Sequence, residues 1–166
     1  MPLARNCALG DGGGMARYCT TVSSPASAED AFTYLADFSN IADWDPGVSR
    51  GELLSGTPGE IGAVYRLQAT MPGRTIPLDY RILESVPPNE TDAGRVVVVA
   101  ETADFTSYDV ITVTPTDSGC DVTYDADLAL RGFRRPFDPL LRLAFAVIGE
   151  RARRGLVTVM QQESFA

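Results

Sequence analysis

Acidic and phenolic side chains are the groups in this sequence that could carry acid–base chemistry. Asp109 alternates with Ile111 and Val113 in a strand-like segment, so the spacing places all three on one face of a strand. Burial of a carboxyl group raises its pKa, which suits the group to general acid or base catalysis. The alternative is a bulge or strand end that leaves Asp109 in water, because carboxylates are rarely buried. Glu101 shares the parity of valines in its own segment and has the same two interpretations.

Two residue types are absent, and this excludes several chemistries. The chain has no histidine, and all 14 basic residues are arginine. Ser-His and Cys-His nucleophiles, Schiff-base chemistry, the phosphate-binding P-loop and histidine-containing zinc sites are therefore excluded. The three cysteines have no CxxC spacing, so we expect no metal site and predict that Cys19 and Cys120 are reduced core residues. We also expect no cofactor.

Composition describes one acidic domain of 166 residues with a net charge of −8, which argues against nucleic-acid binding. No segment has the apolar length of a signal peptide or a membrane span, so we predict a cytoplasmic location. Residues 1–14 end in three glycines and are predicted to be a flexible tail, with the domain covering residues 15–166. Met15 is then a candidate for the natural start.

The order of elements is more informative than the composition. A strand over Arg17–Val22 precedes a helix over Ala28–Ala36, with Ser27 as its N-cap, and a short helical segment over Asp37–Trp44. Six further strands are predicted, with turn residues between them that favour an antiparallel meander. They cover Val48–Leu54, Gly62–Thr70, Arg74–Ser85, Arg95–Glu101, Thr106–Pro115 and Gly119–Leu130.

One long amphipathic helix from about Phe137 to Gln162 closes the chain. Gly149 and Gly155 are unfavourable inside a helix and predict a close approach to the sheet or room for a ligand.

Four stretches resemble the START-like or Bet v 1-like superfamily (SRPBCC), and most closely its polyketide cyclase/dehydrase-type group. They are Val22–Phe32, Asp37–Pro46, Arg81–Pro88 and Thr114–Tyr124, which are similar to the family's first helix, its Trp-acid-Pro segment, a Pro-rich turn and its last hairpin. The resemblance implies an α+β helix-grip fold: a curved antiparallel sheet of about seven strands, two short helices after the first strand, and a long C-terminal helix. It also implies a cavity between sheet and helix. Members bind lipids, sterols, polyketides, quinones or plant hormones, and some catalyse cyclisation or dehydration.

Within that frame we predict which side chains line the cavity. Each aromatic residue has a second interpretation as part of the core, because aromatic rings contribute large apolar area in either place. Arg142, one turn into the last helix, is the candidate partner for a carboxylate on the ligand. The predicted cavity residues are Trp44, Tyr65, Tyr80, Tyr124, Phe133, Arg142 and Phe145.

Three hypotheses for function remain open. The first is a binding or carrier domain, monomeric or homodimeric, for an apolar or aromatic small molecule such as a lipid, polyketide or quinone-like compound. The second is a polyketide cyclase or dehydratase that uses Tyr with Asp109 or Glu101. The third is a protein-interaction or stress-type domain with a collapsed cavity, which a pocket below roughly 300 Å³ would favour. The arginines near the C-terminus form either a solvated face or a weak contact with a membrane surface.

Overall fold

The computed structural model describes residues 15–71, 73–131, 138–162 and 165, and for 15, 16, 71, 130 and 138–146 it describes the backbone alone. The predicted tail and Phe133 lie outside the described residues. The elements follow the predicted order: β1 (Met15–Ser24), α1 (Ala28–Ala36), a 3-10 turn (Phe38–Asn40), α2 (Ile41–Trp44), β2 (Val48–Ser55), β3 (Val64–Met71), β4 (Arg74–Val86), β5 (Gly94–Glu101), β6 (Phe105–Thr116), β7 (Gly119–Leu130) and α3 (Asp138–Met160).

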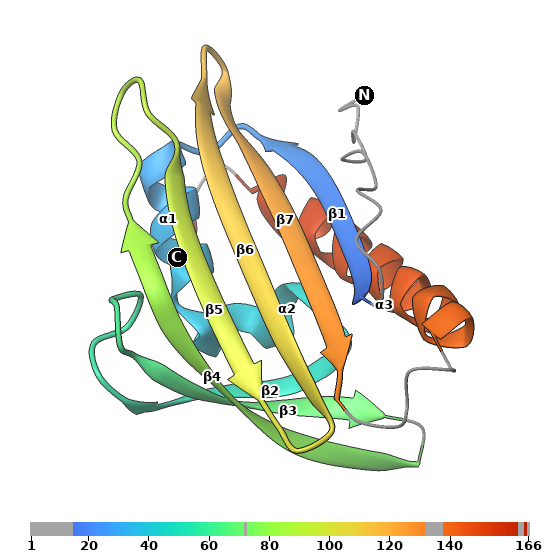
Figure 1. Cartoon of the computed structure of the whole chain (residues 1–166). Coiled ribbons are helices and arrows are strands. Elements are labelled where there is room, and N and C mark those ends of the chain that lie inside the picture. The colour runs from blue at the N-terminus through green and yellow to red at the C-terminus, as the bar shows by residue number, and fades with distance from the viewer. Residues whose placement is uncertain (1–14, 72, 132–137, 163–164, 166) are drawn as a thin grey trace.

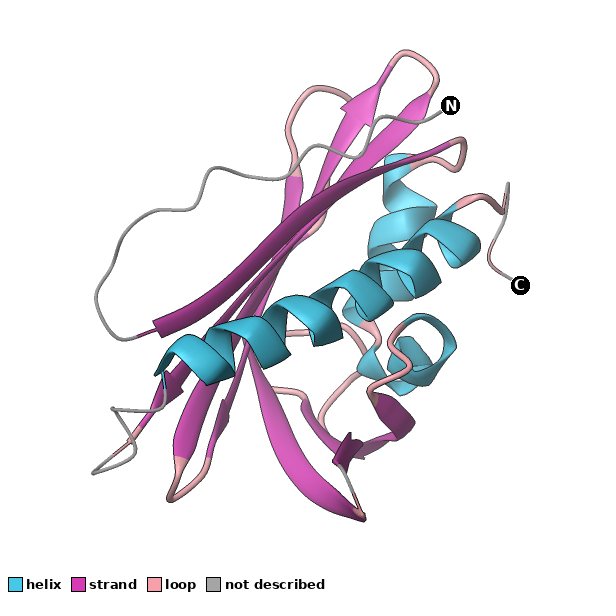
Figure 2. Cartoon of the chain, turned by 90° about the vertical axis from the view of Figure 1, so that its right-hand side faces the viewer, coloured by secondary structure: helices cyan, strands magenta, loops and turns pink. Residues whose placement is uncertain are grey.

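The seven strands form one antiparallel sheet in the order β1-β7-β6-β5-β4-β3-β2. Only β1 departs from sequence order, because it pairs with β7 along its whole length. The sheet is strongly curved, so that β2 and β3 run at a steep angle to β6 and β7, and α3 crosses its concave side next to β1 (Figures 1 and 2). This is the predicted helix-grip fold, with the short helices and α3 on the same side of the sheet.

Alternation along the strands decides which side chains face the helices. In β7, Val122, Tyr124 and Ala126 are buried, whereas the residues between them are only partly buried. In β6, Ser107 and Asp109 are buried in the same alternating series as Ile111 and Val113. The concave face therefore carries the core together with a few polar side chains.

Local contacts fix the helices. Ser27 caps α1: its hydroxyl accepts the Asp30 amide at 3.1 Å and donates to the Asp30 carboxylate at 2.7 Å. Gly155 lets α3 approach α2, because a Cβ at this position would lie 2.0 Å from the carbonyl oxygen of Trp44. A Cβ at Gly149 would lie 2.2 Å from Cγ of Tyr18 on β1. Both glycines therefore allow α3 to approach its neighbours, α2 and β1, closely.

The two strand cysteines differ from each other. Cys120 is free and buried, as predicted. Cys19 is disulfide-bonded, so the prediction that it is a reduced core residue is wrong.

Candidate functional site

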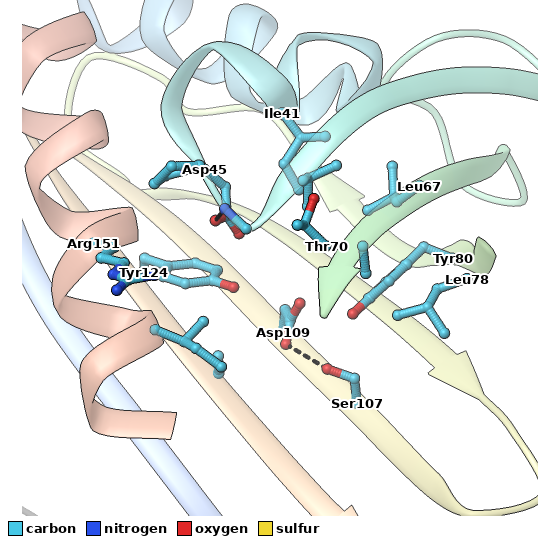
Figure 3. Close-up of a pocket in the computed structure, with 16 residues that line it drawn as sticks. Ile41, Asp45, Leu67, Thr70, Leu78, Tyr80, Ser107, Asp109, Tyr124 and Arg151 are labelled. Carbon is cyan, nitrogen blue, oxygen red and sulfur yellow. Dashed lines mark hydrogen bonds between the residues drawn. The ribbon is translucent and has the colours of Figure 1, made fainter. Parts of the chain in front are cut away.

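A cavity of about 230 Å³ lies between the concave face of the sheet, the turn after α2, and α3 (Figure 3). Apolar side chains from six elements form much of its wall: Ile41, Val48, Leu67, Ala69, Leu78, Ala126 and Ile148. Polar side chains converge on the same space: Asp45, Thr70, Tyr80, Ser107, Asp109, Tyr124 and Arg151. The mixture of an apolar wall and a few convergent polar groups is typical of a small-molecule site.

Asp109 is the central polar group of the cavity. Its side chain is 6 % exposed, and its Oδ1 accepts a hydrogen bond of 3.1 Å from the hydroxyl of Ser107. Ser107 precedes it by two residues on β6 and therefore lies on the same face. Tyr80 on β4 and Tyr124 on β7 point their hydroxyl ends toward Asp109 from its two sides (Figure 3).

Burial has a direct effect on the proton affinity of these groups. Loss of hydration raises the pKa of Asp109 to about 7, and the charge of Asp45 adds to the rise, whereas hydroxyls of Ser107 and Tyr124 oppose it. The pKa of Asp45 is also raised by burial, against the hydrogen bond from the Gly47 amide at 2.8 Å. Burial and the nearby carboxyl raise the pKa of Tyr80 and of Tyr124, so both phenols keep their protons. Near neutral pH, Asp109 can thus either donate or accept a proton.

Trp44 and Tyr65 were predicted to line the cavity, but the structure places neither in its wall. Trp44 is 2 % exposed and meets the ring of Tyr124 edge-on, with ring centroids 5.6 Å apart. Tyr65 packs at a tilt against Phe38, and its hydroxyl accepts the Gly59 amide at 2.9 Å. Trp44 therefore lies behind Tyr124, whose ring separates it from the cavity.

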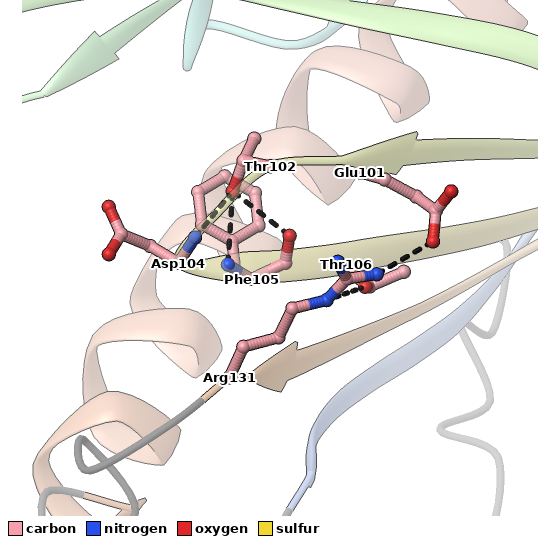
Figure 4. A network of polar contacts seen from close by, with 6 residues as sticks. All are labelled: Glu101, Thr102, Asp104, Phe105, Thr106 and Arg131. Carbon is pink, nitrogen blue, oxygen red and sulfur yellow. Dashed lines mark hydrogen bonds and ion pairs between the residues drawn. The ribbon is translucent and has the colours of Figure 1, made fainter.

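Glu101 lies away from the cavity, on the outer side of the sheet. Its Oε1 pairs with the guanidinium of Arg131 at 2.7 Å, and Nε of Arg131 donates to the hydroxyl of Thr106 at 3.0 Å (Figure 4). The side chain of Glu101 is 64 % exposed. Of the two interpretations that the sequence left open for each carboxylate, the inward-facing one holds at Asp109 and the solvent-exposed one holds at Glu101.

Three further predicted residues lie beyond the described part of the chain: Phe133 entirely, and Arg142 and Phe145 as side chains on α3. Among the described side chains, the arginine in the cavity wall is Arg151, about two and a half turns after Arg142, and it is exposed. Arg153 and Arg154 pair instead with Glu150.

Sequence reasoning missed Asp45 and Ser107 as cavity residues. Ser107 has the parity of Asp109, so alternation alone would have identified it. Asp45 lies in the turn Asp45-Pro46-Gly47, where an acidic residue usually serves the turn itself. It does so here through Gly47, and it also lines the cavity.

The described residues contain neither a membrane-spanning helix nor a cluster of metal ligands. No helix in that part of the chain is long and apolar enough to cross a membrane. No group of three or more Cys, Asp or Glu side chains within it is arranged to hold a metal ion.

A curved seven-stranded sheet that encloses a cavity against a C-terminal helix defines a START-like helix-grip domain. The chain belongs to the family described as "Polyketide cyclase / dehydrase and lipid transport", whose profile matches residues 15–161. Comparison with curated proteins finds no significant match.

Solved structures share the fold at low sequence identity. A START superfamily protein from Mycobacterium smegmatis is 15 % identical with a TM-score of 0.65, covering 89 % of this chain and 97 % of that one. A STAR-related lipid transfer protein from Xanthomonas axonopodis is 17 % identical (TM-score 0.63, covering 95 % and 99 %). The Zhui aromatase/cyclase from Streptomyces sp. R1128 is 16 % identical (TM-score 0.63, covering 88 % and 91 %).

Proposed function

We propose that this protein binds a small, largely apolar molecule in the cavity between the sheet and α3. The observation that carries the proposal is the convergence of Asp109, Tyr80 and Tyr124 on one cavity whose remaining wall is mainly apolar. Apolar area supplies affinity in such a site, and the few polar groups set the orientation of the ligand. The family match, which includes lipid transport and cyclase members, supports the same reading.

The volume of the cavity limits the size of the ligand. Its volume of about 230 Å³ is below the roughly 300 Å³ at which ligand pockets usually begin. A volume below that limit counts in favour of the collapsed-cavity hypothesis. This cavity is nevertheless larger than the cavity of about 150 Å³ that admits benzene in an engineered protein. The size therefore favours a single substituted ring over a long acyl chain or a fused multi-ring polyketide.

The sole tryptophan provides the binding assay. Trp44 contacts Tyr124, which lines the cavity, so a ligand that moves Tyr124 changes the environment of the indole. Native mass spectrometry of freshly purified protein, followed by titration of one-ring compounds against Trp44 fluorescence, tests the proposal. We expect saturable binding of at least one such compound.

A matched pair of variants separates cavity binding from surface binding. Ala126→Leu adds three carbons inside the cavity wall and should abolish the response. Ala129→Leu makes the same change on the opposite face of β7 and should leave the response intact. Failure of every probe with the native protein would instead favour the collapsed-cavity hypothesis.

Acid–base catalysis is the second candidate function, favoured by the buried Asp109 carboxyl with a pKa of about 7 beside two phenols. Such a group can remove a proton from a carbon next to a carbonyl while a phenol donates to the carbonyl oxygen. Exchange of the methyl protons of acetophenone in deuterated buffer, followed by NMR, tests this step. We expect exchange faster than in buffer alone with the native protein and at the buffer rate with Asp109→Asn, whereas a pure carrier gives the buffer rate with both.

A further inference from the structure

Two carboxyl groups enter the cavity from different elements, and neither has a cationic partner among the side chains that the structure describes. Asp109 projects from the sheet and Asp45 from the turn after α2 (Figure 3). Their hydrogen-bond partners are the Ser107 hydroxyl and the Gly47 amide. Throughout the described residues, no arginine forms an ion pair with either carboxyl, although Arg17, Arg66 and Arg131 each pair with an acid on the outer face of the sheet.

The titratable and charged groups around Asp109 are mostly acidic. The cavity receives Tyr80 from β4, Tyr124 from β7, Asp45 from the turn after α2, and Arg151 from α3. Asp127, on the other face of β7, also raises the pKa of Asp109. Arg151 is the one described cation in the wall, and it is exposed. Because water screens an exposed charge, Arg151 contributes little to the buried Asp109.

Hydrogen-bond donors for a carboxylate are already present. Ser107 donates to Asp109, and the phenols of Tyr80 and Tyr124 keep their protons and point toward it. Positive charge in the described wall is limited to the exposed Arg151, and a buried carboxylate is costly until a cation pairs with it. A proton supplies that charge in the unliganded cavity.

The remaining wall fits the rest of a small organic cation. Leu67, Leu78 and Ile148 offer apolar contact, and Tyr124 offers the face or edge of an aromatic ring beside the carboxyls. Aromatic rings near a carboxylate stabilise an ammonium group further. The carboxyl groups attract a cation, so the charged end of the ligand is expected at the Asp109 end of the cavity.

We propose that the ligand is a small organic amine, a single ring or short apolar chain with one ammonium group, whose nitrogen is held between Asp109 and Asp45. This inference rests on the proposed binding function of the same cavity. It adds the charge class of the ligand, because a neutral ketone or alcohol would leave the carboxyls to be neutralised by protons alone.

The test compares three probes of nearly equal size, 2-phenylethylamine, 2-phenylethanol and 3-phenylpropionate, by isothermal titration calorimetry of the full chain at pH 7. Hydrogen bonds to charged groups are strong, so we expect the amine to bind about tenfold or more tighter than the alcohol, and the propionate to bind weakest. Amine binding should also release protons as Asp109 ionises, which titrations in two buffers of different ionisation enthalpy measure.

Variants locate the contact. Asp109→Asn keeps the shape of the side chain and removes its charge, so the amine should lose about tenfold or more in affinity while the alcohol changes little. Asp79→Asn makes the same change on the outer face of β4 and should change neither affinity. If Asp109→Asn does not fold, Asp45→Asn replaces it, and the probe series on the native protein decides independently.

The outcomes distinguish this inference from the function on which it rests. Equal or tighter binding of the alcohol, or amine binding without proton release, would overturn the amine assignment while supporting a neutral ligand in the same cavity. Absence of binding by all three probes and by every other one-ring compound would overturn the proposed function as well.

Discussion

Replacing Asp109 by Asn should make the protein more stable, and the gain should grow as the pH rises. The folded-state pKa of Asp109 is about 7, against an ordinary value of 3.8. Between these two pH values the folded chain holds a proton that the unfolded chain has lost, so raising the pH favours unfolding. While Asp109 is protonated in the folded chain it does not reduce the free energy of unfolding. As the pH rises from about 4 to about 7, the free energy of unfolding falls because the buried carboxyl has to ionise.

The magnitude follows from the proton affinity. Each tenfold change in affinity corresponds to about 1.4 kcal/mol, so the rise in pKa from 3.8 to about 7 corresponds to about 4 kcal/mol. Asn stays neutral at every pH and keeps the size of the side chain. The variant and the native protein should have similar stability at pH 4, and the variant should be more stable by up to about 4 kcal/mol at pH 8.

Urea unfolding followed by Trp44 fluorescence at pH 4 to 8 measures this difference, and contributions from all other groups largely cancel in it. Asp79→Asn is the matched control. Hydrogen bonding to Arg66 lowers the pKa of Asp79, so this variant should lose stability relative to the native protein above the ordinary pKa and show no further change from pH 5 to 8. A native-to-Asp109→Asn difference that is constant from pH 4 to 8 would refute the argument that Asp109 is buried and unpaired.

Three other predictions concern the frame of the site. Gly155→Ala should destabilise the protein by roughly 1–3 kcal/mol in thermal unfolding, because its Cβ would lie 2.0 Å from the carbonyl oxygen of Trp44; a gain in stability, the usual result in an exposed helix, would contradict the close approach. Ser27→Ala should cost about 1 kcal/mol through loss of the α1 cap, whereas no cost would show that the capping hydrogen bonds contribute nothing. Burial raises the pKa of the Cys120 thiol to about 11, so a thiol-specific reagent at pH 8 should leave it unmodified until the protein unfolds; fast labelling of the native protein at Cys120 would count against this burial.

The fold was predictable because local signals agree with one another along this chain. The Ser27 cap, the turn before β2 and the alternation in β7 each specify an element boundary or a buried face. The helix α1 and the strand β7 were predicted to the residue, and other boundaries shifted by one or two positions. The short helical segment over Asp37–Trp44 divides into a 3-10 turn and a single α-helical turn, a distinction that side-chain pattern does not encode.

The site was less predictable, because alternation along a strand groups side chains by face but tells neither which face is concave nor how deeply each side chain is buried. Asp109 alternates with Ile111 on the concave face of β6, whereas Glu101 alternates with Val97 on the outer face of β5, where Val97, which is also buried, made this face look like the core side. Tyr65 and Tyr80 face inward at directly paired positions of β3 and β4, and only Tyr80 reaches the cavity, because the Tyr65 hydroxyl is taken up by the loop amide of Gly59. Such differences arise from tertiary packing and loop contacts that one sequence does not display.

Composition and structure together limit which groups can neutralise the cavity carboxyls. The chain contains no lysine and no histidine, so any internal counter-ion for a buried carboxyl has to be an arginine. The arginine of the described cavity wall, Arg151, is exposed at the helix surface, and the guanidinium groups of Arg17, Arg66 and Arg131 are occupied by acids of the outer face. No arginine that the structure describes pairs with Asp109 or Asp45, which leaves a proton or a ligand to supply the neutralising charge within this part of the chain. A proton on Asp109 and a cationic ligand beside it exclude each other. Ligand affinity and the titration of Asp109 are therefore two measurements of the same equilibrium.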